Sequence, residues 1–148
     1  MDEKCCQHLN LTPDQIKACP VDTTFRIMGK KFTVHILRNV ILLGQNRFNQ
    51  FLESIEGANP KTLSVRLREM EKDGLLTRKI YPETPPKVEY TVTEKGMALA
   101  PILMQMAEFS MKYCCEDVFK DGRPRTLKQV FGASVVGTMA HKSFKNPK

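Results

Sequence analysis

The chain has 148 residues, 41% of them hydrophobic and 26% charged, a composition typical of one globular domain with a single core. It contains no apolar run of about 18 residues, so no membrane span is expected. Its N-terminus carries acids and a Cys pair rather than the basic and then apolar pattern of a signal peptide. We therefore expect a cytoplasmic protein whose five cysteines are reduced thiols.

The formal net charge is +7, and the basic residues are concentrated in two stretches. Residues 23–52 contain five Lys or Arg and no acid, and residues 120–148 contain seven Lys or Arg against Asp121 alone. A basic surface of this kind attracts phosphate and gives salt-dependent affinity for nucleic acid. The alternative is a solvated basic face that only aids solubility.

Helices are predicted first, over residues 13–18, 22–28, 31–43 and 47–55. The third is expected to be buried, because apolar residues recur around one wide face of it. The fourth is predicted to be the first helix of a helix-turn-helix, with residues 56–59 as the turn.

An amphipathic helix follows this turn. Asn59 and Pro60 suit its N-cap and first position, and Asp73-Gly74 ends it, because glycine adopts the left-handed conformation without steric cost. Its apolar stripe recurs at i, i+4 and i+7, and consists of Leu63, Leu67 and Met70. Basic and polar residues occupy the opposite side of this helix.

Two strands are predicted after the amphipathic helix, over residues 75–81 and 88–93. The connection over residues 82–87 holds three prolines, which cannot continue a ladder. A basic helix followed directly by a two-stranded ribbon predicts a winged helix-turn-helix, mostly α with a small β wing. The helix suits a DNA major groove about 12 Å wide.

A long helix is predicted over residues 97–115. Its apolar residues lie around much of the circumference, whereas a surface helix needs one apolar face. We therefore expect a homodimer built on the N- and C-terminal helices. The predicted interface residues are Leu99, Leu103, Met106 and Phe109. The alternative is that the basic segment after Gly122, which has a short helix over residues 127–131 and a fraying end, folds back over this face within one chain.

The segment KTLSVRLREMEKDGLLTRKIYPETPPKVEYTVTEKG, residues 61–96, resembles the core signature of HxlR-type winged-helix transcription regulators. Shorter matching pieces lie at residues 19–20, 27–32, 36–37 and 46–49. The resemblance extends from Cys19 to Tyr113. The family usually carries Trp where this chain has Phe32, and often a second Trp after the wing, for which Phe109 is the stand-in. These replacements are expected to change packing detail and not the fold.

The residues predicted to contact DNA are Arg47, Lys61, Thr62, Ser64, Val65, Arg66, Arg68 and Lys87. Arginine reads guanine with a forked pair of hydrogen bonds, Ser and Thr reach bases or phosphate, and Val contacts a thymine methyl. Arg47 begins the helix that crosses the DNA backbone, and Lys87 is expected at the wing tip. The alternatives are ion pairs of the helix arginines with Glu69 and Glu71, plain surface charge at Arg47, and an ordinary proline-blunted hairpin end.

Cys19 is a candidate redox sensor, because matching cysteines in some members of the family sense oxidants or electrophiles. A nearby Lys or Arg would make its thiolate reactive, and reversible oxidation would then move the helices. The alternative is a buried thiol that acts as a small apolar side chain. The vicinal pairs Cys5-Cys6 and Cys114-Cys115 lack the C-x2-C spacing of a zinc site, so no metal or other cofactor is expected.

No catalytic motif such as a phosphate loop, G-x-S-x-G or H-E-x-x-H is found, and an enzyme is not expected. A thiol-dependent enzyme acting through Cys19 is the best version of that alternative. The predicted regions are an N-terminal arm with a short helix (1–20), a winged helix-turn-helix domain (21–96), a dimerisation helix (97–121) and a basic extension (122–148).

The predicted function is regulation of transcription by a homodimer that binds a pseudo-palindromic operator in double-stranded DNA, with a possible response to oxidants or electrophiles. The runner-up is a winged-helix interaction module that docks its basic helix on an acidic protein partner. The operator, the direction of regulation, the inducing signal and any small-molecule effector are not indicated by the sequence.

Overall fold

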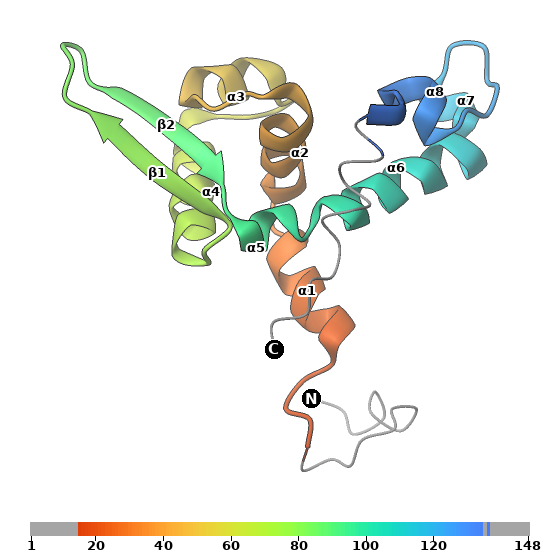
Figure 1. Cartoon of the computed structure of the whole chain (residues 1–148), viewed down its shortest axis with the longest axis horizontal. Helices are drawn as coiled ribbons and strands as arrows, with labels where there is room; N and C mark the ends of the chain where they lie inside the picture. Colours follow the sequence, from red (N-terminus) through yellow and green to blue (C-terminus); the bar gives the residue numbers. More distant parts are fainter. Residues whose placement is uncertain (1–14, 135, 137–148) are drawn as a thin grey trace.

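The computed structural model describes residues 15–134 and residue 136. In this part of the chain the elements are α1 (Pro20–Met28), α2 (Thr33–Leu43), α3 (Phe48–Ser54), α4 (Pro60–Lys72), β1 (Leu76–Tyr81), β2 (Lys87–Val92), α5 (Glu94–Met97), α6 (Ala100–Tyr113), α7 (Cys115–Val118) and α8 (Leu127–Phe131). The expected fold, mostly α with a small β wing, is confirmed (Figure 1). Among the described residues, none of the helices combines the length and apolar character that a membrane crossing requires.

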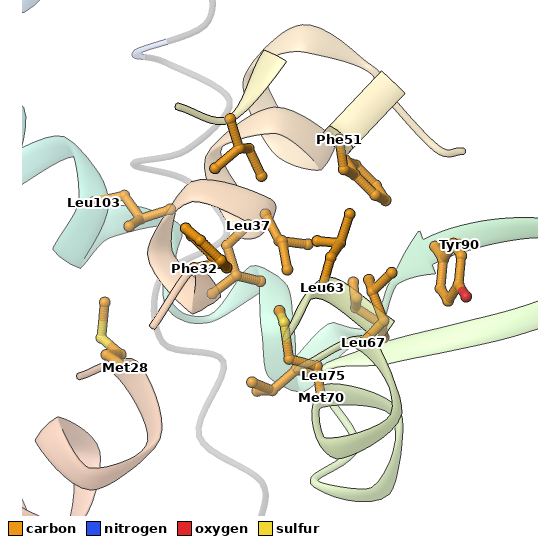
Figure 2. Close-up of a cluster of buried hydrophobic side chains, with 13 residues drawn as sticks. Met28, Phe32, Leu37, Phe51, Leu63, Leu67, Met70, Leu75, Tyr90 and Leu103 are labelled. Carbon is orange, nitrogen blue, oxygen red and sulfur yellow. The ribbon is translucent and has the colours of Figure 1, made fainter. Parts of the chain in front are cut away.

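The hydrophobic core lies between α2, α3, α4 and the start of the ribbon. Figure 2 shows Leu37, Phe51 and Leu63 converging from the three helices. The largest fully buried apolar side chains are Phe51, Ile36, Leu37, Leu63, Leu67, Met70, Leu75 and Leu76. Burying a side chain of this size contributes about 1.5–3 kcal/mol. The predicted apolar stripe of α4 is therefore confirmed as the buried face of this helix, which packs in the core with α2 and α3.

Local sequence sets both ends of α4. The Asn59 side chain accepts a hydrogen bond from the Thr62 N–H at 2.9 Å, and Pro60 occupies the first turn, as predicted. At the other end Gly74 has a φ of 73°, and the Leu75 N–H donates to the Met70 carbonyl at 2.9 Å. This pattern is a Schellman motif, which turns the chain from α4 into β1.

The N-terminal elements differ from the predicted ones. The helix expected from residue 31 begins at Thr33, because Phe32 has a left-handed φ of 69°. The helix expected over residues 13–18 is not found, since residues 15–19 form a turn and bends, and residues 13–14 lie outside the described residues. A helix of one or two turns is unstable without tertiary packing, which explains this error.

The ribbon is anchored at its base. β1 and β2 pair antiparallel, from Leu76 opposite Val92 to Tyr81 opposite Lys87. The Tyr90 ring lies 6.1 Å from the Phe51 ring, and the Tyr90 N–H donates to the Asn46 carbonyl at 2.8 Å. The ribbon therefore projects from the body beside α3 and α4 (Figure 1).

The long helix predicted over residues 97–115 is found as α6, but with shorter bounds, because the chain breaks on either side of it into the short helices α5 and α7. A Cβ on Gly96 would lie 2.3 Å from the Leu75 carbonyl oxygen, so α5 passes directly over the start of β1. The chain restarts as α6 with Pro101 in the first turn, because proline has no N–H and is excluded from a helix interior. α6 runs away from the body on the side opposite the wing (Figure 1).

The short helix predicted over residues 127–131 is confirmed as α8. Its Leu127 packs against Ala100 and Met104 of α6. Part of the basic extension thus covers one side of α6 within the same chain. The last ten residues, for which fraying was expected, lie outside the described residues.

Candidate nucleic-acid interface

The outward face of α4 carries most of the residues predicted to contact DNA. Lys61 and Arg68 are exposed, and Val65 is 46% exposed between them. Thr62 and Ser64 are half-buried on the same helix. The apolar stripe lies on the opposite side, so these five side chains are presented to solvent by a helix whose own packing is complete.

Arg66 is a correction to the predicted set. Its side chain is 13% exposed, its Nε donates to the Lys31 carbonyl at 2.7 Å, and its Nη1 pairs with Glu69. The ion pair with Glu69 was one of the alternatives, and the carbonyl contact adds a partner 35 positions away in sequence. Arg66 therefore lies along the flank of α4 toward the turn before α2, where the Lys31 carbonyl accepts its hydrogen bond.

Arg47 joins the start of α3 to the wing. Its Nη2 lies 3.8 Å from Glu89 Oε1, and the side chain remains half exposed. The Gln50 side chain accepts the backbone N–H groups of Asn46 and Arg47 at 2.9 and 3.0 Å, which fixes the first turn. The phosphate contact predicted for Arg47 stays a prediction, and its half-exposed side chain at the start of α3 is accessible for it.

Lys87 does not lie at the wing tip as predicted but begins β2, opposite Tyr81. Its Nζ lies 2.8 Å from Glu89 Oε1 and 5.0 Å from the centre of the Tyr81 ring. Lys79 lies over the same ring at 4.8 Å. The hydrogen bond from Lys87 holds the pKa of Glu89 below its ordinary value.

Sequence reasoning missed the basic side chains of β1. Arg78 and Lys79 are exposed, as is Ile80 between Lys79 and Tyr81. The sequence pattern that could have revealed them is a run of adjacent polar residues in β1, without the alternation of apolar and polar residues that a strand buried on one face has. Such a run indicates a ribbon that is exposed to solvent on both faces. The wing is thus a cationic strip with a tyrosine, next to the outward face of α4.

Cys19 is the N-cap residue of α1 and is half-buried. Its carbonyl accepts hydrogen bonds from Thr23, from the N–H at 2.9 Å and from the hydroxyl at 2.8 Å. Cys114 and Cys115 are also half-buried, at the junction of α6 and α7. Over residues 15–134, no three His, Cys, Asp or Glu side chains are grouped as metal ligands would be.

An apolar groove of about 580 Å³ separates α1 from α6. Its walls include Val21, Phe25, Ile102 and Met106, and Met106 is 48% exposed. Phe109, one turn further along α6, is 61% exposed. This face is uncovered within the described residues.

Two of the predicted interface residues pack in or against the chain's own core. Leu103 is 6% exposed and lies in the same cluster as Phe51, and Leu99 packs against that cluster. Leu103 is therefore corrected to a core residue, since α6 turns it toward the core (Figure 2). Met106 and Phe109 remain as candidates for contact with a second chain.

Two helices joined by a tight turn, the second with an outward polar and basic face beside an antiparallel ribbon, define a winged helix-turn-helix protein. The chain matches the HxlR-like helix-turn-helix family over residues 27–118, and it belongs to this family of transcription regulators. The resemblance on which the sequence prediction rested is confirmed.

Individual relatives of this chain are also transcription regulators by name. The chain is 37% identical over 105 residues to the HTH-type transcriptional regulator YdeP of Bacillus subtilis, an alignment that covers 71% of this chain and 81% of the relative. It is 36% identical over 97 residues to the regulator YodB of the same organism, covering 65% and 86% of the two chains. A solved structure of the redox regulator HypR in its oxidized form is similar, with a TM-score of 0.56, 35% identity, and 62% of this chain and 94% of that chain covered.

Proposed function

We propose that this regulator acts in the cytoplasm as a homodimer that binds a pseudo-palindromic site in double-stranded DNA. α4 enters the major groove, and the ribbon contacts the flanking backbone. The observation that carries the proposal is the division of α4 into a buried apolar stripe and an outward face with Lys61, Ser64, Val65 and Arg68. The second contact region consists of Arg47, Lys79 and Lys87, whose charges suit phosphate.

The homodimer is supported by the groove between α1 and α6. Ile102, Met106 and Phe109 expose a continuous apolar strip on a helix that already packs its other side against its own chain. Contiguous apolar surface of this kind marks an interaction site. A second copy related by a two-fold axis covers both strips at once and doubles the DNA contact.

The binding proposal is tested by selection from a random pool of double-stranded DNA. The selected fragments are expected to share two half-sites related by two-fold symmetry, about 10 base pairs or a multiple of that apart. Arg68→Ala should weaken binding to the selected site by about 1–3 kcal/mol. Lys128→Ala, which removes an exposed lysine of α8, is the matched control and should bind as the wild type does.

Competition separates this proposal from a module that docks on an acidic protein. An excess of random DNA should fail to displace the selected site at a concentration where unlabelled selected site displaces it fully. If random and selected DNA compete equally, the operator proposal is rejected and the interaction module gains support.

We also propose that Cys19 senses an oxidant. Support comes from the similarity to HypR, whose structure is described as that of a redox regulator, and from the position of Cys19 at the start of α1, which lines the groove. In the simplest step the Cys19 thiolate attacks a peroxide oxygen, the O–O bond breaks, hydroxide leaves and a sulfenic acid remains. Movement of α1 would then alter the dimer.

Hydrogen peroxide should change the DNA affinity of the wild type and leave that of Cys19→Ser unchanged. The double variant Cys114→Ser, Cys115→Ser is the matched control and should respond as the wild type does. A response that persists without Cys19 and disappears in the double variant would assign the sensor to the vicinal pair.

A further inference from the structure

We propose that Arg66 is a positioning residue that, with Lys30 and Glu69, fixes the orientation of α4 from the turn between α1 and α2. Arg66 would then control how Arg68 and Lys61 meet DNA without touching it. This inference rests on the proposed DNA binding. It concerns a side chain whose sequence position predicted a direct DNA contact.

The contacts form a connected set on one flank of α4. Arg66 donates its Nε to the Lys31 carbonyl at 2.7 Å and pairs through Nη1 with Glu69. Lys30 Nζ lies 3.5 Å from Glu69 Oε2 and 3.5 Å from Asp73 Oδ2. Glu69 is thus shared by one cation of α4 and one cation of the turn, and it is the residue on which the set depends.

The same end of α4 is held from α5. Lys95 Nζ donates to the Asp73 carbonyl at 2.7 Å. The Lys95 ammonium group, next to the C-terminus of α4, also interacts favourably with the negative end of the helix dipole. The C-terminal half of α4 therefore has polar ties to segments on both sides of it in sequence.

The conformation of the turn between α1 and α2 directs the Lys31 carbonyl toward Arg66. The Lys31 carbonyl precedes α2, where no helical N–H reaches it, and it belongs to the same peptide unit as the Phe32 nitrogen. The left-handed φ of 69° at Phe32 therefore sets the direction of this carbonyl. A bulky residue rarely adopts such a φ, and the buried Phe32 ring in the core holds it there.

The polar ties do what the apolar stripe cannot. Contacts of Leu63, Leu67 and Met70 press α4 against the body, but apolar contact is not directional and restrains rotation about the helix axis only weakly. A guanidinium-to-carbonyl hydrogen bond and an ion pair are directional. A small rotation of α4 about its axis would carry Arg68 away from the major groove of the DNA. The residues that contact DNA therefore depend on the contacts of Arg66, Lys30 and Glu69.

The decisive variant is Glu69→Gln, because two explanations predict opposite signs. If Glu69 acts only through its charge, removing a carboxylate beside DNA should tighten binding. If it holds Arg66 and Lys30, binding to the selected site should become about 10-fold weaker, as for the loss of one base contact. Glu71→Gln removes a neighbouring exposed carboxylate of α4 that lies outside the set, and it serves as the control.

A salt series separates a positioning role from a phosphate contact. Arg68→Ala should lower the slope of log affinity against log salt by about 1, and Arg66→Ala should weaken binding with the wild-type slope. Arg66→Lys keeps the charge and loses the fork, so it should bind as weakly as Arg66→Ala.

Tighter or unchanged binding by Glu69→Gln overturns the positioning role, as does wild-type affinity in Arg66→Lys. A wild-type chain that selects no DNA sequence rejects the proposed function itself. Thermal unfolding of each variant is the control for folding. The variants should still unfold cooperatively, because the polar set lies outside the buried core.

Discussion

The body built from α2, α3 and α4 differs from α6 in how completely each buries its apolar residues. In the body, Phe51 and Leu63 are fully buried, and the polar side chains of α4 such as Lys61 and Arg68 are exposed. On α6, Leu103 is buried whereas Phe109, two turns further along, is 61% exposed. The body thus satisfies its own packing within one chain, and the groove side of α6 does not.

This difference indicates what each region is for. A complete core, with the polar ties of Arg66 and Glu69 on its flank, lets α4 present a polar face with a fixed geometry, as recognition requires. An incomplete apolar face instead calls for a further surface to cover it. The α8 helix packs through Leu127 on a different side of α6 and leaves the groove side uncovered within the described residues.

The largest expected effect comes from a cavity in the body. Leu67→Ala should destabilise the fold by about 2–5 kcal/mol, because Leu67 is 1% exposed and the core cannot collapse around the lost methyl groups. Met106→Ala on the groove side of α6 is the matched control and should cost less than about 1 kcal/mol at concentrations where the chain is monomeric. Urea unfolding measures both, and equal losses would contradict the distinction between the two regions.

The next effect concerns α6. The double variant Met106→Glu, Phe109→Glu should be monomeric, because four carboxylates would face one another or lie close together across a two-fold interface. Operator binding should weaken by at least about 2 kcal/mol when only one half-site contact remains. Sedimentation gives the size and a binding titration gives the affinity. A wild-type chain that sediments as a monomer at micromolar concentration would count against the dimer.

A smaller effect is expected from a buried polar contact in the body. Asn39 is fully buried, and its Nδ2 donates to Ser54 Oγ at 2.8 Å and to Gln45 Oε1 at 3.0 Å, which ties α2 to α3. Asn39→Ala removes the donor to Ser54 Oγ, whereas Gln45 Oε1 still accepts from the Ser54 hydroxyl at 2.8 Å. The lost hydrogen bonds should cost about 1–3 kcal/mol. The exposed Asn49→Ala is the control, and urea unfolding compares the two.

The smallest effect is a pH dependence in the wing. The hydrogen bond from Lys87 lowers the pKa of Glu89 in the folded chain. The stability that this hydrogen bond contributes to the fold is therefore present above the unfolded pKa of Glu89 and is lost as pH falls through the folded pKa. Lys87→Ala should return the pKa of the Glu89 carboxyl toward its ordinary value. Carboxyl chemical shifts followed through an acid titration measure the change. An unaltered midpoint would show that Lys87 does not hold Glu89.

The sequence by itself determined α4, its two ends and the wing. The stripe of Leu63, Leu67 and Met70 repeats with the period of a helix, and the signals at Asn59 and Gly74 act within a few residues. Local interactions of this kind are readable without tertiary structure, and for that reason these elements agreed with the prediction.

Only the tertiary structure decided which side chains of these elements are turned inward. The Lys31 carbonyl and Arg66 are separated by 35 positions, so no local pattern indicates their contact. The close approach of Gly96 to the Leu75 carbonyl likewise depends on how the chain returns over the ribbon. Leu103 falls on the buried side of α6 because the helix restarts at Ala100, and a helix assumed to run on from residue 97 places its faces differently. These outcomes depend on contacts between distant segments, and a single chain's periodicity carries no information about them.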